Sequence, residues 1–113
     1  MTVKKPAPAW LEPHLSVCEA IATLFAPYAE VMVHDLRRRR VVGLWSPIAK
    51  HKVGDPSLNS EMPRYSEDGR VVGPYGRVLP DGRHVTSVGV VLHNAKGAPR
   101  GLQRTHEVAR VAR

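Results

Sequence analysis

The sequence predicts an α+β fold, in which a mostly antiparallel β-sheet carries helices on one side. An apolar repeat with helical spacing occupies the first quarter of the chain, and β-prone segments joined by short turns follow it. Two Asp-Gly pairs mark tight turns between such segments. The predicted order is helix, strand, strand, short helix, strand, strand and a fifth strand. A chain of 113 residues fits one domain.

The first predicted element is a helix from about Glu12 to Phe25, after a lysine- and proline-rich start (1–8) that we expect to be disordered. Pro13 suits a first helical turn, and Pro27 ends the helix. Apolar side chains recur at spacings of four and three and predict one buried face. That face comprises Leu11, Leu15, Cys18, Ala22 and Phe25, widened by Val17, Ile21 and Leu24.

A β-hairpin is predicted next, from segments 28–36 and 41–48. Four adjacent arginines, Arg37 to Arg40, connect the two strands and favour a solvent-exposed tip because like charges repel when buried. His34 and Asp35 are adjacent on the first strand, so their side chains point to opposite faces. The two side chains therefore cannot act as a base and its orienting partner.

A short helix is predicted after this hairpin, with Asp55 as its cap, Pro56 at its first position and Glu61 near its end. A second hairpin follows, from segments 71–79 and 84–92 around Asp81-Gly82. A bulge at Gly73 or Gly76 would reverse which side chains face the core.

A turn at 93–97 predicts one more antiparallel strand, but the side chains after it do not resemble one. The segment GLQRTHEVARVAR (101–113) contains three arginines and few bulky apolar residues. We therefore expect three regions: a disordered start (1–8), a folded domain (9–102) and a basic tail (103–113) in the place of the last strand.

The composition raises a nucleic-acid alternative, because the net charge is +7 and basic proteins attract phosphate backbones. The excess charge is concentrated in Arg37–Arg40 and in the tail, which would form the binding surface of a small basic protein. No helix-turn-helix pattern or zinc-ligand spacing is visible. No apolar run suits a membrane span or a signal peptide, and Cys18 is the single cysteine, so we expect a cytoplasmic protein.

Reactive side chains do not form a recognisable catalytic set. The six histidines are scattered singly, which predicts no metal site, and Cys18 lies on the apolar helix face, which predicts a core role. An enzymatic hypothesis would rest only on His34, Tyr75 and Ser87, for which no nucleophile–base spacing is visible. We therefore expect no catalysis, and the sequence does not tell whether the protein binds a cofactor.

Several stretches together resemble the YheO-like PAS domain, a family of bacterial transcriptional regulators. They are LEPHLSVCEAIATLFAPYAEVMVHDL, VGDPSL, VVGPYGRVLPDGRHVTSVGVVL and NAKGAPRGL, and they span Leu11 to Leu102. The resemblance implies a PAS-like five-stranded antiparallel sheet flanked by helices, acting as a sensor or a dimerisation module. The matching residues are His34, Asp35, Gly54, Asp55, Pro56, Tyr75, Asp81, Gly82 and Ser87. Gly54 and Gly82 are most simply turn residues.

The chain departs from the family pattern after Leu102, where an apolar last strand and later a DNA-binding helix-turn-helix region are expected. A reading-frame change near codon 102 would explain the abrupt change to an arginine-rich sequence after Leu102. On this interpretation the domain binds a small molecule or a second copy of itself, and DNA only through the helix-turn-helix region. We expect a ligand pocket between the sheet and the N-terminal helix. Its predicted lining is His34, Trp45, Tyr75 and Ser87.

Overall fold

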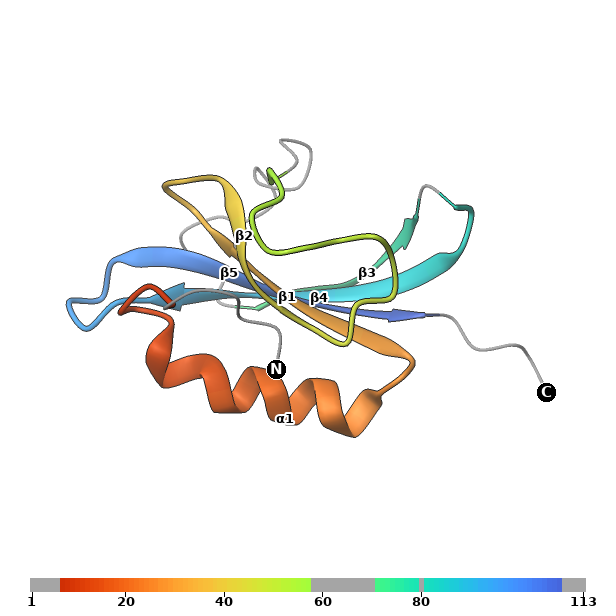
Figure 1. Ribbon diagram of the computed structural model, residues 1–113, viewed down its shortest axis with the longest axis horizontal. Helices are drawn as coiled ribbons and strands as arrows, with labels where there is room; N and C mark the ends of the chain where they lie inside the picture. Colours follow the sequence, from red (N-terminus) through yellow and green to blue (C-terminus); the bar gives the residue numbers. More distant parts are fainter. Residues whose placement is uncertain (1–6, 58–70, 80, 109–113) are drawn as a thin grey trace.

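Helix α1 packs against one face of a five-stranded antiparallel sheet in the computed structural model, which describes residues 7–57, 71–79 and 81–108 (Figure 1). The strand order is β2-β1-β5-β4-β3. The predicted α+β class is confirmed. The elements are the 3₁₀ turn η1 (Glu12–His14), α1 (Leu15–Phe25), β1 (Ala29–Asp35), β2 (Arg40–Trp45), β3 (Val71–Val78), β4 (His84–His93) and β5 (Pro99–Val108).

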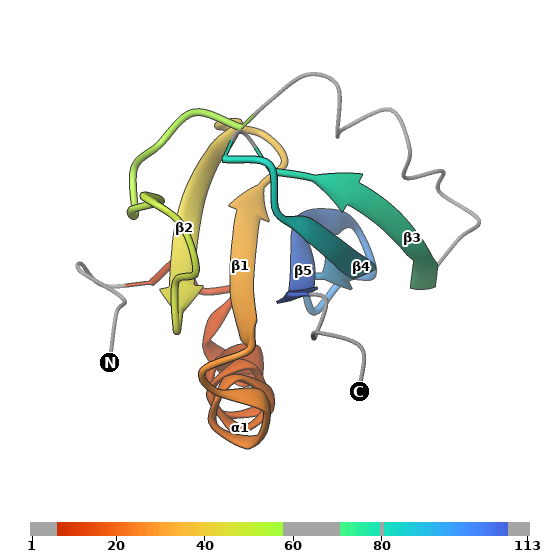
Figure 2. The same cartoon turned by 90° about the vertical axis from the view of Figure 1, so that its right-hand side faces the viewer.

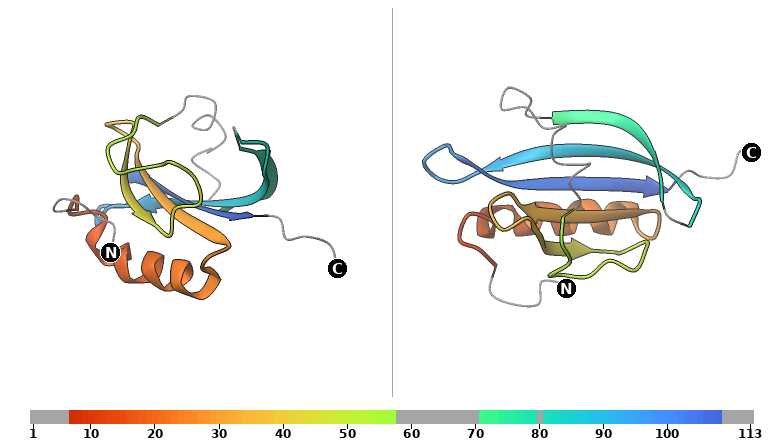
Figure 3. Two further views of the ribbon diagram at one scale, coloured as in Figure 1. Left: turned by 45° about the vertical axis from the view of Figure 1, so that its right-hand side comes forward. Right: turned by 90° about the horizontal axis from the view of Figure 1, so that it is seen from above.

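The predicted fifth strand is present and forms the centre of the sheet. β5 pairs with β1 on one side and with β4 on the other (Figure 3). It crosses Leu102 without interruption, so residues 103–108 belong to the sheet and the boundary expected at residue 102 is not observed. The side chains of β5 have only a weak preference for a β-strand. The backbone hydrogen bonds to a neighbouring strand on each side hold this segment extended. Residues 109–113 lie outside the described part.

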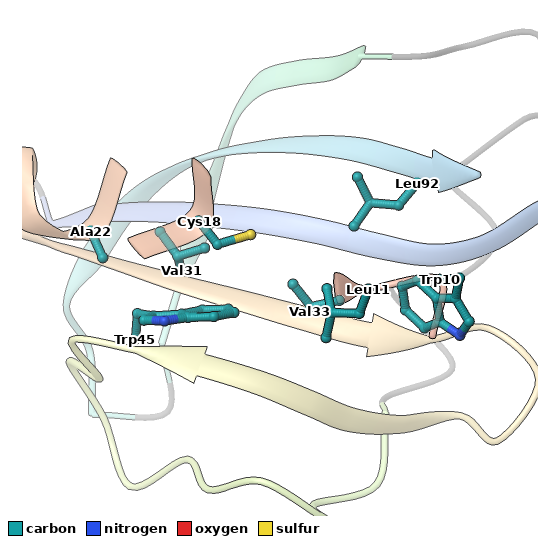
Figure 4. Packing of buried hydrophobic residues seen from close by; sticks show 8 residues of the cluster. All are labelled: Trp10, Leu11, Cys18, Ala22, Val31, Val33, Trp45 and Leu92. Carbon is teal, nitrogen blue, oxygen red and sulfur yellow. The ribbon is translucent and has the colours of Figure 1, made fainter. Parts of the chain in front are cut away.

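The hydrophobic core fills the space between α1 and the sheet (Figure 4). Leu15 and Ile21 pack against its margin. The buried members are Trp10, Leu11, Cys18, Ala22, Val31, Val33, Trp45 and Leu92. Burial raises the pKa of the Cys18 thiol to about 11, so the thiol stays protonated at neutral pH, as a core side chain does.

The apolar face predicted for α1 is too wide. Val17 is 60% exposed, Leu24 76% and Phe25 38%. A helix that rests on a single sheet buries only the stripe that faces it, and α1 lies along the sheet with its other side turned away (Figure 2). None of the described helices has the length and apolarity needed to span a membrane.

The first predicted hairpin is confirmed in β1 and β2, with the arginine block exposed at its tip. The buried Asp35 carboxylate orders the turn by accepting the backbone N–H groups of Arg37 and Arg38, both at 2.9 Å. His34 and Asp35 point to opposite faces, as expected. Positive φ angles at Gly54 (+100°) and Gly82 (+89°) confirm both as turn residues.

Residues 55–57, where the short helix from Asp55 to Glu61 was expected to begin, are not helical. Pro56 forms an isolated antiparallel bridge with Arg40, and the Ser57 N–H donates to the Arg39 carbonyl at 2.8 Å. These contacts hold the chain extended beside the start of β2. Residues 58–61, the remainder of that prediction, lie outside the described residues.

Candidate functional site

A pocket of about 410 Å³ lies on the sheet face opposite α1, which we call the pocket face. The segment between β2 and residue 57 passes over this face (Figure 1). The pocket was predicted on the α1 side, but that side is filled by the hydrophobic core. The lining residues are Met32, His34, Val41, His51, Asp55, Pro56, Arg77, Val78, Leu79 and His106.

Strand register gathers buried polar side chains on the pocket face. Met32 of β1 pairs with Arg104 of β5, and Glu30 pairs with His106. On the other side of β5, Ser87 of β4 pairs with His106. Directly paired residues point to the same face, so these groups form one cluster. Its buried members are Glu30, His34, Ser87, Arg104 and His106.

His34 presents an imidazole nitrogen to the pocket. The side chain is 3% exposed, and its Nδ1 lies 2.7 Å from the Ser57 Oγ. The buried Nε2 has no hydrogen-bond partner among the described residues. Burial, followed by the positive charge of Arg104, lowers the pKa of His34 to about 4. The ring is therefore neutral at pH 7 and has one nitrogen available to a ligand.

His106 forms a second buried pair, with its Nδ1 2.5 Å from the Ser87 Oγ. Burial, and then Arg104, lowers the pKa of His106 to about 3. Such a ring is neutral and weakly basic at pH 7, and the Ser87 side chain is fully buried. The pair is therefore suited to shaping the pocket wall rather than to activating a nucleophile.

Glu30 anchors the segment that covers the pocket face. Its carboxylate lies 3.0 Å from the His51 Nδ1 and accepts the Ile48 N–H at 3.2 Å. The hydrogen bond that the His51 ring donates to the Glu30 carboxylate raises the pKa of His51. The Arg83 guanidinium donates to the Ile48 carbonyl and so ties the β3–β4 turn to the same segment. Together these contacts hold the covering segment in place over the sheet.

The predicted lining residues separate into different environments. His34 lines the pocket, and Ser87 lies behind it through its contact with His106. Tyr75 pairs with Ser87 on β3, after a register shift between Val72 and Tyr75, but is not among the lining residues. Trp45 packs in the core on the α1 side (Figure 4). The structure thus places two of the four predicted residues at or behind the pocket wall.

Sequence reasoning missed Arg77, Arg104 and His106. Arg104 and His106 were missed because residues 103–113 were expected to form a basic tail. The register shift between Leu92 and His93 also decides the face of His106. Without that irregularity, counting back from the His93–Pro99 pair puts Ser87 opposite Thr105, whose side chain points to the α1 face. Alternation of Leu102, Arg104 and His106 along β5 was the available signal. In residues 7–57, 71–79 and 81–108, no three side chains form a group that could hold a metal ion.

We expect the free energy of unfolding to fall as the pH decreases from about 6.5 to 4. The unfolded chain binds protons on histidine near pH 6.5, whereas folded His34 and His106 resist protonation to about 4 and about 3. Above pH 6.5 both histidines are neutral in the folded and the unfolded chain, and the free energy of unfolding keeps its full value. Below pH 6.5 each histidine lowers the free energy of unfolding by roughly 1 kcal/mol per pH unit. His51, with its raised pKa, is charged in both states over most of this window.

Urea denaturation between pH 7 and pH 4 measures this slope. His106→Gln should reduce the slope by about half. Replacement of the exposed His84 by Gln is the matched control and should leave the slope unchanged. A stability that is constant across this range would contradict the prediction.

A five-stranded antiparallel sheet with one helix before its first strand is a PAS-like α+β arrangement. The sequence profile of the YheO-like PAS domain matches residues 4–102, and the chain belongs to that family. It is also 40% identical over 89 residues to the transcriptional regulator DauR of Pseudomonas aeruginosa. The match covers 79% of this chain and 42% of that regulator, so the chain spans less than half of its length. No solved structure matches the chain.

The family match ends inside β5, at Leu102. Arg104 and His106 therefore lie beyond it, although both belong to the buried cluster of the pocket face.

Proposed function

We propose that the chain is the sensory domain of a transcriptional regulator and that it binds a small molecule in the pocket opposite α1 without changing it chemically. The family membership and the regulator relative support the regulatory role. The observation that carries the ligand is the His34 Nε2, which is buried at the pocket wall with no hydrogen-bond partner among the described residues. An unsatisfied buried polar atom is costly unless a ligand or water satisfies it. Pockets of this volume are typical of small-molecule sites.

Binding without catalysis agrees with the chemistry of the buried pair. His106 is too weakly basic to activate Ser87 at neutral pH, because its pKa is lowered to about 3. In this proposal the domain works in the bacterial cytoplasm as part of a regulator and pairs with a second copy of itself. Contact with DNA belongs to the helix-turn-helix region that the family resemblance implies.

The nucleic-acid alternative retains one supporting observation, the exposed arginines at the tip of the first hairpin. Arg104, which that hypothesis assigned to the basic tail, is fully buried in β5. A fluorescence-anisotropy titration with duplex DNA, repeated across salt concentrations, separates the two functions. Affinity that falls steeply with salt and is lost when Arg37–Arg40 become glutamines would favour the alternative.

A thermal-shift and ¹⁵N NMR screen of small metabolites tests the ligand proposal directly. We expect at least one compound to raise the unfolding temperature and to shift the amide signals of pocket residues. Val78→Trp should block this binding, because Val78 lines the pocket and is 58% exposed. Val71→Trp is the matched control, since Val71 is equally exposed on β3 but is not part of the lining.

Binding that survives Val78→Trp would place the ligand elsewhere on the domain. A screen with no pocket ligand at all would contradict the proposed function.

A further inference from the structure

A second hollow lies at one end of the sheet, away from the pocket opposite α1. It has a volume of about 550 Å³ and is formed where the start of the described chain, the β1–β2 turn and the β4–β5 turn come together (Figure 1). It shares no lining residue with the first pocket. We call it the basic pocket, and its lining residues are Pro8, Ala9, Trp10, Arg38, Asn94, Ala95, Lys96 and Arg100.

Backbone contacts hold the three cationic residues of the basic pocket in place. The Leu36 N–H donates to the Arg100 carbonyl at 2.9 Å, which ties the β1–β2 turn, with Arg38, to the start of β5. In the β4–β5 turn, the Asn94 side-chain oxygen accepts the Lys96 N–H at 3.0 Å. The three cationic side chains therefore start from ordered backbone in three separate segments and border one space.

Two buried donors of this lining have no hydrogen-bond partner among the described residues. They are the Trp10 Nε1 and the Arg100 Nε. Trp10 is only 7% exposed, and its ring lies so close over Gly101 that a Cβ there would overlap it. Its nitrogen lies on the outer edge of the hydrophobic cluster (Figure 4). A buried N–H without an acceptor is costly, so an acceptor bound in the basic pocket is favoured.

The charges of the basic pocket have one sign. Its lining includes Arg38, Lys96 and Arg100, and none of the described residues that line it is acidic. The acids closest in sequence to Trp10 and Arg38 are Glu12 and Asp35, and both lie outside the lining. The buried carboxylate of Asp35 is engaged by two backbone N–H groups of the β1–β2 turn. The basic pocket therefore favours an anion, and no carboxylate in its described wall opposes one.

We propose that the basic pocket binds a phosphate dianion, as the free ion or as the terminal phosphate of a small organic ester. The guanidinium groups of Arg38 and Arg100 offer forked N–H donors that match phosphate oxygens, and Lys96 adds a compact charge. The Trp10 indole N–H donates from the buried side. Donors that come from several directions suit the oxygens of a phosphate better than a planar carboxylate. This site is separate from the proposed ligand pocket opposite α1 and does not depend on it.

The two tryptophans provide a signal at the site and an internal control, because each gives its own indole N–H peak in a ¹H–¹⁵N spectrum. Inorganic phosphate, glycerol 3-phosphate, dimethyl phosphate and acetate are titrated at pH 7.5 and constant ionic strength. We expect inorganic phosphate or glycerol 3-phosphate to shift the Trp10 peak to saturation and to leave the Trp45 peak in place. The Trp45 Nε1 is also buried without a partner among the described residues, but Trp45 is outside the lining.

The four probes separate the charge and the source of the anion. Dimethyl phosphate and acetate carry a single negative charge and should bind at least about tenfold more weakly than the dianions, a difference that one charge-assisted contact provides. The tighter of inorganic phosphate and glycerol 3-phosphate identifies the source as the free ion or an ester.

Variants connect the binding to the named residues. Arg38→Gln and Lys96→Gln should each weaken the dianion about tenfold, and both side chains are exposed, so the fold should be kept. Arg37→Gln is the matched control, because it removes the same charge from the neighbouring exposed residue outside the lining. It should change the affinity less than twofold. The unfolding temperature of each variant confirms that it folds.

Several results would overturn the proposal. A Trp10 peak that does not move with either dianion, or that moves together with the Trp45 peak, excludes a phosphate site at this position. Acetate that binds as tightly as phosphate excludes the phosphate class. Dimethyl phosphate that binds as tightly excludes the dianion in favour of a nucleic-acid backbone. Equal losses in Arg37→Gln and Arg38→Gln would show that only the general positive charge of the hairpin tip attracts the anion.

Discussion

A chain that ends at Leu102 is expected to lose its folded state. Truncation there removes residues 103–108, the half of β5 that pairs with Ala29–Val33 of β1 and with Val85–Val90 of β4. Because β5 is central, its loss separates the sheet into two parts and leaves backbone groups unpaired on both neighbours. Each buried unpaired group costs about 1–3 kcal/mol, and several exceed the roughly 5–15 kcal/mol margin of a small domain.

Circular dichroism and the dispersion of the ¹⁵N amide spectrum measure this loss. The matched control ends at Val108, which keeps every described strand, and it should give the spectrum of the full chain. If the chain ending at Leu102 folds as stably as the full chain, residues 103–108 do not hold the sheet together. The interpretation of this segment as a basic tail would then be correct.

Gly101→Ala is expected to destabilise the domain markedly, although it adds only a single methyl group. Gly101 lies on the α1 side of β5, opposite Asp35 of β1 and Leu92 of β4. A Cβ at this position would overlap the ring of Trp10, which is itself buried in the core. Overpacking of this kind typically costs about 1–3 kcal/mol, because neither the central strand nor the indole can move freely.

Urea denaturation of Gly101→Ala and the parent chain measures the change in unfolding free energy. Gly76→Ala is the matched control, because Gly76 has open space where a Cβ would be placed and lies on the edge strand β3. Its stability should change by less than about 0.5 kcal/mol, as at most surface sites. Equal effects at the two glycines would show that Trp10 does not pack closely over β5.

Much of the fold follows from local sequence signals, because they act between neighbours along the chain. The spacing of Leu11, Leu15, Cys18 and Ala22 predicted the helix and the part of it that packs on the sheet. Its outer positions, Val17 and Leu24, were wrongly assigned to the core. No local pattern shows how many layers will cover a helix, and in this domain a single sheet covers one stripe.

The candidate site was less accessible to prediction because it depends on which face each side chain takes. His34 was predicted to line a pocket and does line one, but on the sheet face opposite the predicted one. Trp45 alternates regularly along its strand, but only the placement of α1 decides that its face is the core rather than the pocket. His106 reaches the pocket wall, and Arg104 the buried cluster of the pocket face, through a strand that their side chains did not predict.

The sequence by itself determined the helix, the two hairpins with their turns, and the place of a further strand after residues 93–97. These features arise from spacing, proline positions and turn residues, which act over a few residues. Only the tertiary structure decided that residues 99–108 form the central strand and that the pocket lies opposite α1. The physical reason is that β5 gains its hydrogen bonds from β1 and β4, which are distant in sequence. One register shift between Leu92 and His93 then sets which face His106 occupies.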